Sequence, residues 1–148
     1  MKKKVFIAAP ISGFDRKTEY NFFRQFILYL IDALRQSGFE VCSEVEQISK
    51  TENYDSPMKS VNDDFSNILS SDIFLLLHPK KIQSSSLIEL GFACANKKVI
   101  VLAGKKEDFP YLAKGLETSN IRAKMLDIDG FSNDKTTIII EAIDSMCL

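Results

Sequence analysis

The sequence lacks tryptophan and has a single histidine and three cysteines among its 148 residues. One histidine, His78, cannot build a multi-histidine zinc site, and any Ser-His-Asp triad would depend on this one residue in a strand-like run. The cysteines share no C-x-x-C spacing, and their odd number without an export signal indicates free thiols in a reducing compartment. We therefore expect a cytoplasmic protein that binds no metal.

Long apolar runs and an excess of one charge are also missing. The 19 basic and 20 acidic residues give a formal net charge of −1, which supplies no broad positive field for a nucleic-acid backbone. The apolar run 5–10, which follows three lysines, is too short for a signal sequence or a membrane span. We therefore expect a small molecule as the partner, with no role for nucleic acid or a membrane.

Glycine and proline are few, with 6 and 4 residues, so neither a disordered nor a fibrous chain is indicated. A chain of 148 residues is long enough to bury one substantial core. We predict one domain that spans residues 1–148.

The apolar residues follow two patterns that alternate along the chain. Short apolar runs bounded by Gly, Pro or polar residues are typical of buried strands, whereas i, i+3, i+4 spacing is typical of helices. A polar loop is expected over 44–57. This alternation predicts an α/β protein with a doubly wound, flavodoxin-like (Rossmann-like) sheet of five parallel strands in the order 2-1-3-4-5. The expected strands are 5–9, 39–42, 73–78, 98–102 and 124–128, and the expected helices are 18–37, 60–70, 84–96 and 135–146.

In such a sheet the ligand crevice lies at the carboxyl ends of the strands where the strand order reverses, between the first and third strands. Neither adjoining loop, 10–16 or 78–86, contains a G-x-G-x-x-G or P-loop pattern, so we expect no nicotinamide cofactor and no nucleoside triphosphate hydrolysis. The serines at 84–86 either bind a phosphate or sugar hydroxyl or simply cap the next helix. The candidate substrate-binding residues are Ile11, Ser12, Gly13, Asp15, Gln83, Ser84 and Ser86.

Glu89 is the strongest catalytic candidate. Its helix is apolar nearly all round, so we expect this carboxylate to be partly desolvated. A purely structural alternative exists, because residues 86–89 fit the S-x-x-E capping box, in which the glutamate closes the first helical turn.

Asp64 is the second catalytic candidate. On the helix expected over 60–70, Val61, Phe65, Ile68 and Leu69 form the predicted core stripe. Asp64 then lies on the flank of this stripe and can face the crevice, whereas Asp63 points away. Carboxyl pairs are what glycosyl transfer uses, one to attack the anomeric carbon and one to manage protons. A solvated surface charge is the ordinary alternative.

Four segments together carry a family resemblance. They are 5–13 (VFIAAPISG), Asp15-Arg16 with Tyr20, Asp64 followed eight residues later by Asp72-Ile73, and 86–93 (SLIELGFA). In order and spacing they resemble the nucleoside 2-deoxyribosyltransferase family, which includes the deoxynucleoside 5′-monophosphate N-glycosidases.

The resemblance implies a role for three residues. Glu89 corresponds to the nucleophile that captures the deoxyribosyl group, Asp64 to the acid that contacts the base or sugar, and Tyr20 to the residue that positions the nucleophile. The implied reaction is a double displacement with retention of configuration. The chain departs from the family at Gln83, where deoxyribosyltransferases often carry an aspartate, and at Ser12-Gly13-Phe14, where the monophosphate N-glycosidases carry an Arg and a Gly pair. The base, the 5′-phosphate and the acceptor therefore stay open.

Family members complete their active sites across subunits, so the resemblance also implies a homodimer or a higher homo-oligomer. Phe22, Phe26 and Tyr29 form a second aromatic stripe on the first expected helix, which is a candidate interface.

Two other functions are compatible with the sequence. A Toll/interleukin-receptor-like domain shares a flavodoxin-like sheet and a glutamate in a helix, and it cleaves the nicotinamide glycosidic bond of NAD. A nucleotide-sensing module without turnover is the third hypothesis, and the missing aspartate at Gln83 is its best support.

Overall fold

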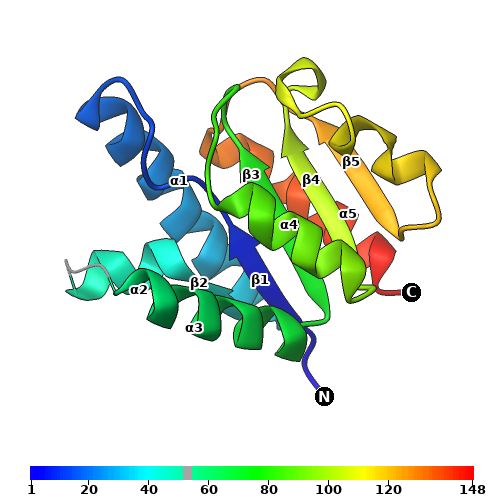
Figure 1. Ribbon diagram of the computed structural model, residues 1–148. Helices are drawn as coiled ribbons and strands as arrows, with labels where there is room; N and C mark the ends of the chain where they lie inside the picture. The colour runs from blue at the N-terminus through cyan, green and yellow to red at the C-terminus, as the bar shows by residue number, and fades with distance from the viewer. Residues whose placement is uncertain (52–54) are drawn as a thin grey trace.

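The computed structural model describes residues 1–51 and 55–148, which form a sheet of five parallel strands between helices (Figure 1). The strand order is β2-β1-β3-β4-β5, which confirms the predicted doubly wound α/β fold. The strands are β1 (Lys4–Ala8), β2 (Glu40–Ser43), β3 (Ile73–His78), β4 (Val99–Gly104) and β5 (Ala123–Asp127). The α-helices are α1 (Lys17–Gln36), α2 (Glu44–Thr51), α3 (Pro57–Ser70), α4 (Ser86–Ala95) and α5 (Thr136–Met146), and the 3₁₀ helices are η1 (Lys106–Asp108), η2 (Ala113–Thr118) and η3 (Asn133–Lys135).

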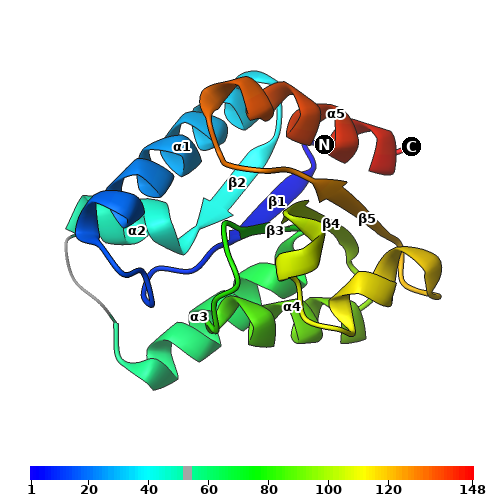
Figure 2. The ribbon, with the colours of Figure 1, turned by 90° about the horizontal axis from the view of Figure 1, so that it is seen from above.

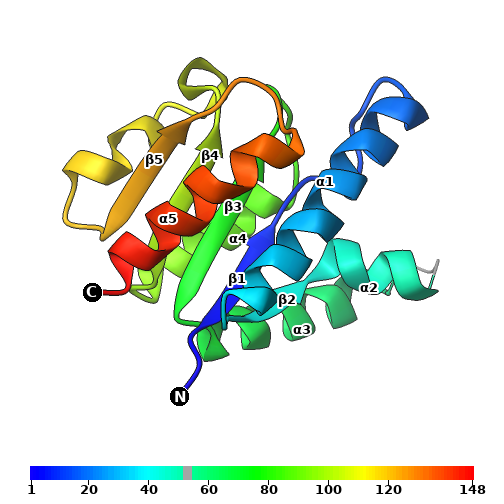
Figure 3. The same cartoon turned by 180° about the vertical axis from the view of Figure 1, so that it is seen from behind.

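Helices cover both faces of the sheet. Seen from above, α1 and α5 lie on one face, and α3 and α4 lie on the other (Figure 2). The view from behind shows α1 and α5 in front of the strands (Figure 3). The side chains of β1 alternate accordingly: Val5 and Ile7 belong to the core beneath α1 and α5, whereas Phe6 and Ala8 belong to the core beneath α3 and α4. The sheet is therefore buried on both faces.

Helix α1 is 20 residues long and amphipathic, with its apolar residues at helical spacing. One part of the sequence prediction for this helix is wrong. Phe26, which we expected on an exposed stripe, is 2% exposed, because the chain after β5 brings Phe131 to within 5.2 Å of its ring centroid. Phe22 and Tyr29 remain exposed. Among residues 1–51 and 55–148, no helix has the length and apolar character needed to cross a membrane.

The segment after β2 forms helix α2, where the sequence predicted a polar loop over 44–57. That prediction is wrong for residues 44–51, and residues 52–54 lie outside the described part of the chain. Val45 of this helix is buried in the core beneath α1. Two apolar positions on a helix of 8 residues are too short a pattern to recognise in a sequence.

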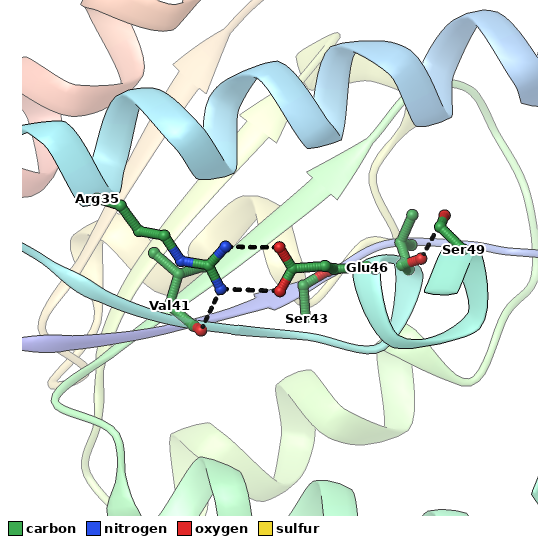
Figure 4. A network of polar contacts seen from close by, with 6 residues as sticks. Arg35, Val41, Ser43, Glu46 and Ser49 are labelled. Carbon is green, nitrogen blue, oxygen red and sulfur yellow. Dashed lines mark hydrogen bonds and ion pairs between the residues drawn. The ribbon is translucent and has the colours of Figure 1, made fainter. Parts of the chain in front are cut away.

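Polar contacts with other elements hold α2 in place. The Arg35 guanidinium of α1 donates to both carboxylate oxygens of Glu46, over 2.6 and 2.8 Å (Figure 4). The Ser43 hydroxyl of β2 accepts a hydrogen bond from the Glu46 N–H at 3.4 Å, and within α2 Ser49 donates to the Val45 carbonyl at 2.8 Å. A bidentate pair between arginine and a carboxylate has a defined geometry, so it fixes the position of α2 against α1.

Helix α3 begins three residues earlier than expected, at Pro57, after Ser56 caps its first turn by accepting from the Lys59 N–H at 3.3 Å. The predicted core stripe is only partly correct. Ile68 is fully buried, but Val61 and Leu69 are half exposed. Val61 lines an open hollow rather than the core, which explains its exposure.

The ends of β3 and β4 lie close together. His78 pairs in register with Gly104, and a β-carbon at Gly104 would overlap the His78 carbonyl oxygen. The His78 ring is buried against Phe109, and Nε2 lies 3.1 Å from the Asp108 carbonyl oxygen. Burial lowers the pKa of His78, so the neutral ring donates from Nε2 to this carbonyl. These contacts give His78 a structural role.

Candidate active site

A hollow of about 350 Å³ opens at the carboxyl ends of β1 and β3, where the strand order reverses. Its walls come from the loops after β1 and β3, the start of α2, and helices α3 and α4. Among the described residues, no lysine or arginine side chain lines it. The polar lining residues are Ser12, Glu44, Asp55, Ser60, Asp64, Ser84, Ser85, Ser86 and Glu89.

Glu89 lies in the first turn of α4 and is 8% exposed. Burial, followed by the nearby carboxyls of Asp64 and Glu44, raises the pKa of Glu89 to about 8. The capping box that the sequence allowed does not form. Helix α4 starts at Ser86, its N-cap residue Ser85 makes no side-chain cap hydrogen bond, and the Ser86 hydroxyl instead contacts that of Ser84. Capping therefore does not explain this carboxyl.

Asp64 projects from α3 toward Glu89. It is half-buried, and its carboxyl shares hydrogen bonds with those of Glu89 and Glu44. Burial, followed by the charge of Glu44, raises the pKa of Asp64 to about 7. Its neighbour Asp63 is exposed and pairs with Lys59 at 2.6 Å. The flank position expected for Asp64 and the outward position expected for Asp63 are thus both present.

Glu44 is the third carboxyl of the hollow, and we did not single it out from the sequence. It is the first residue of α2, directly after the carboxyl end of β2, and it hydrogen-bonds Asp64. Burial is the main reason that the pKa of Glu44 is raised. The rule that ligands bind at the carboxyl ends of parallel strands could have indicated Glu44, had it been applied to β2 as well as to β1 and β3.

An aromatic pair joins the two helices that carry Asp64 and Glu89. The rings of Phe65 on α3 and Phe92 on α4 stack with centroids 3.9 Å apart and planes inclined by 13°. Asp64 directly precedes Phe65, and Glu89 lies three residues before Phe92, so this stack fixes α3 against α4 next to the two carboxyls.

The two loops named as substrate-binding candidates differ in how they meet the hollow. Ile11, Ser12, Ser84 and Ser86 line it, with Ser84 and Ser86 next to the N-terminal turn of α4. A helix start of this kind presents backbone N–H groups, which favour phosphate or hydroxyl oxygens.

Gly13, Asp15 and Gln83 do not line the hollow but lie where the two loops touch. Asp15 pairs with Lys80 at 3.2 Å, and Gln83 is exposed. Gly13 has a φ of +88°, and a β-carbon there would lie 3.0 Å from Cδ1 of Ile82. The first loop therefore requires glycine at this position in order to approach the second loop.

Tyr20 lies beside the hollow and not in it. It lines an adjoining hollow of about 350 Å³ with Lys17, Asn21 and Arg24, and Ile11 belongs to both hollows. Its ring packs against Phe14, with centroids 5.4 Å apart. The role of Tyr20 in positioning Glu89 stays a prediction.

Over residues 1–51 and 55–148, no group of three or more His, Cys, Asp or Glu side chains is arranged to hold a metal ion. What the hollow offers chemically is a set of neighbouring carboxyls with raised pKa values, which can transfer protons and attack carbon.

Known structures share this fold. The CMP N-glycosidase BcmB of Clostridium botulinum matches with a TM-score of 0.62 and 22% identity, over 97% of this chain and 99% of its own. BlsM matches with a TM-score of 0.79 and 20% identity, over 98% and 91% of the two chains. A conserved protein from Enterococcus faecalis V583 matches with a TM-score of 0.59 and 16% identity, over 98% and 99%. No protein-family model and no curated protein matches the sequence. At these identities the likeness establishes the shared fold.

Proposed function

We propose that this protein cleaves or transfers the N-glycosidic bond of a nucleoside or deoxynucleoside, or of its 5′-monophosphate, through a glycosyl intermediate on Glu89. The observation that carries the proposal is the buried contact between Glu89 and Asp64 in the hollow at the switch point of the sheet. Two carboxyls in contact do not ionise together, so one acts as an acid while the other acts as a nucleophile.

The first half of the reaction transfers the sugar to the enzyme. One carboxylate oxygen of Glu89 attacks C1′, the bond between C1′ and the base nitrogen breaks, and its electron pair stays with the base. Asp64 donates its proton to the departing base, which leaves as a neutral molecule. This step requires Glu89 to be ionised and Asp64 to be protonated.

The second half releases the sugar. Water, or the nitrogen of a second base, attacks C1′ and gives a proton to Asp64, and the bond between C1′ and Glu89 breaks. Asp64 regains the proton that it lost, and Glu89 regains its carboxylate. Two displacements at C1′ retain its configuration.

Ser84 and Ser86 are proposed to receive the 5′ end of the substrate, because they line the hollow at the start of α4. The acidic lining supports a neutral ligand near the carboxyls, since an anion there would be repelled. A phosphate, where the substrate has one, is therefore expected to lie at the serine end. The fold shared with BcmB, a CMP N-glycosidase, makes cytidine 5′-monophosphate the first compound to test.

The test is chromatography of ribo- and deoxyribonucleosides, their 5′-monophosphates and NAD after incubation with the protein, with and without a free acceptor base. We expect release of a nucleobase, or exchange with the acceptor base, and a loss of at least about a thousandfold in Glu89→Ala. The matched control is Glu141→Ala, which replaces an exposed glutamate on α5.

Three results would contradict the proposal. Release of nicotinamide from NAD alone would favour the Toll/interleukin-receptor-like activity. Ligand binding without any product over long incubation would favour a sensing module. Turnover in Glu89→Ala near the wild-type rate would show that the reaction does not use this carboxyl.

A further inference from the structure

The hollow contains a half-buried carboxyl, Glu44, that the proposed reaction does not use. Glu44, Asp64 and Glu89 form a chain in which Asp64 is the middle member and hydrogen-bonds both others. When one member of this chain is protonated, its O–H can donate a hydrogen bond to the ionised carboxylate of its neighbour. The chain therefore begins at the nucleophile and ends at Glu44.

Glu44 faces two hollows. It lines the substrate hollow, and together with Asp64 it also lines a second hollow of about 390 Å³ between β2, α2 and α3. Protons can reach Glu44 from the second hollow without passing the substrate, whereas Glu89, at 8% exposed, lines only the first.

The backbone that carries Glu44 is held by contacts outside the hollow. Glu46, two residues later, binds Arg35 of α1 through both carboxylate oxygens, and its N–H donates to Ser43, which directly precedes Glu44 (Figure 4). Glu44 is thus presented to Asp64 by an anchored helix start.

The charges around Asp64 favour a proton in the chain. Glu44 faces Asp64 from α2, Glu89 faces it from α4, and Asp63 is its neighbour on α3. Every charged group that shifts the pKa of Asp64 is acidic.

The groups around Glu44 also favour a proton in the chain. Asp55 acts on Glu44 from the segment before α3, and Cys42 of β2 and Glu46 of α2 line the second hollow with Glu44. Lys59, the nearby cation on α3, is bound by Asp55 at 3.3 Å and by Asp63 at 2.6 Å.

The proposed reaction needs a group that takes up the proton of Glu89. Burial and the neighbouring acidic charges raise the pKa values of both Glu89 and Asp64, so both carboxyls favour their protonated forms. Glu89 must lose its proton before it can attack C1′, and Asp64 cannot accept that proton while it keeps its own.

We infer that Glu44 is a positioning residue of this site, which takes up a proton through Asp64 so that Glu89 becomes a carboxylate while Asp64 stays protonated. The inference rests on the proposed function and extends it by one residue. The proton of Glu89 moves to Asp64 as the proton of Asp64 moves to Glu44. When Asp64 protonates the leaving base, Glu44 returns its proton to Asp64. When water attacks C1′, its proton passes to Asp64 and the proton of Asp64 passes to Glu44. No proton is therefore gained or lost over the cycle.

The test is the dependence of kcat/KM on pH in wild type, Glu44→Gln and Glu44→Asp, with Glu40→Gln at the exposed start of β2 as the control. Glutamine keeps the size and can accept the hydrogen bond from Asp64, but it cannot take up a proton. In Glu44→Gln the active form must therefore arise by loss of a proton to solvent. We expect the acid limb of the profile to move up by about one pH unit. Glu44→Asp and Glu40→Gln should keep the wild-type limb.

A purely structural role for Glu44 would lower the rate equally at every pH. The inference would therefore be overturned if, in Glu44→Gln, the acid and basic limbs of the kcat/KM profile stay in place or both move to lower pH. A second measurement needs neither turnover nor a folded variant: carboxyl-carbon NMR of the wild type should show Glu44, Asp64 and Glu89 responding to the same titration steps. Independent steps would overturn the proton chain. Absence of base release from any substrate would instead refute the proposed function, which the titration does not test.

Discussion

Replacing Glu89 with glutamine is expected to stabilise the fold at alkaline pH while abolishing the proposed reaction. Glu89 is 8% exposed, and its pKa of about 8 lies well above its ordinary value of 4.5. An acid with a raised pKa binds its proton more tightly in the folded protein, so the stability of the fold falls as the pH rises from 4.5 through 8. Since each pKa unit corresponds to about 1.36 kcal/mol, the cost at pH 8 is on the order of 4 kcal/mol, and at pH 5 it is below about 1 kcal/mol.

Glutamine has nearly the same size and no charge, so the variant escapes this cost. A buried amide with an unpaired group costs about 1–3 kcal/mol, which leaves a net gain of about 1–3 kcal/mol at pH 8 and none at pH 5. Urea unfolding at both pH values, followed by far-UV circular dichroism because the chain has no tryptophan, measures the difference. Glu141→Gln on the exposed face of α5 is the control. If wild type and Glu89→Gln lose stability equally between pH 5 and pH 8, the carboxyl is not desolvated as described.

Three further predictions concern the acid, the sheet and the assembly. Asp64→Asn should lower base release at least about tenfold more than Asp63→Asn, or about 1.4 kcal/mol, because only Asp64 contacts the nucleophile; equal rates in the chromatographic assay would remove its role. Gly104→Ala should cost at least about 2 kcal/mol in urea unfolding, because its β-carbon would overlap the backbone of β3, whereas Gly115→Ala meets open space and should change little. Light scattering at micromolar concentration should give a dimer or larger oligomer that Phe22→Ser weakens, and a monomeric wild type would contradict this.

The sheet could be predicted because its strands are bounded by strong local signals. The run 73–78 lies between Asp72 and Pro79, and β3 matches it residue for residue. Helix α2 has no comparable signal. It is held by the burial of Val45 and by the ion pair of Glu46 with Arg35 on another helix, and such tertiary partners are not visible in a local pattern.

The candidate site, like the fold, could be predicted only in part. Glu89 was identifiable because an acidic residue in an apolar helix is costly unless it has a purpose, and Asp64 because helical geometry separates it from Asp63. Glu44 was missed because its importance depends on α2 starting where β2 ends. Val61 was misassigned to the core because helical spacing identifies an apolar face without showing whether that face meets a core or an open hollow.

The stacked rings of Phe65 and Phe92 join the two helices that carry the proposed acid and the proposed nucleophile. In glycoside hydrolysis, carboxyls about 5 Å apart form a covalent intermediate, whereas a gap of about 6.5–9.5 Å admits water directly and inverts the sugar. The stack, with ring centroids 3.9 Å apart, joins α3 and α4 beside the residues that carry Asp64 and Glu89. In the proposed reaction, the anomer that is released would thus depend in part on an aromatic contact between two helices.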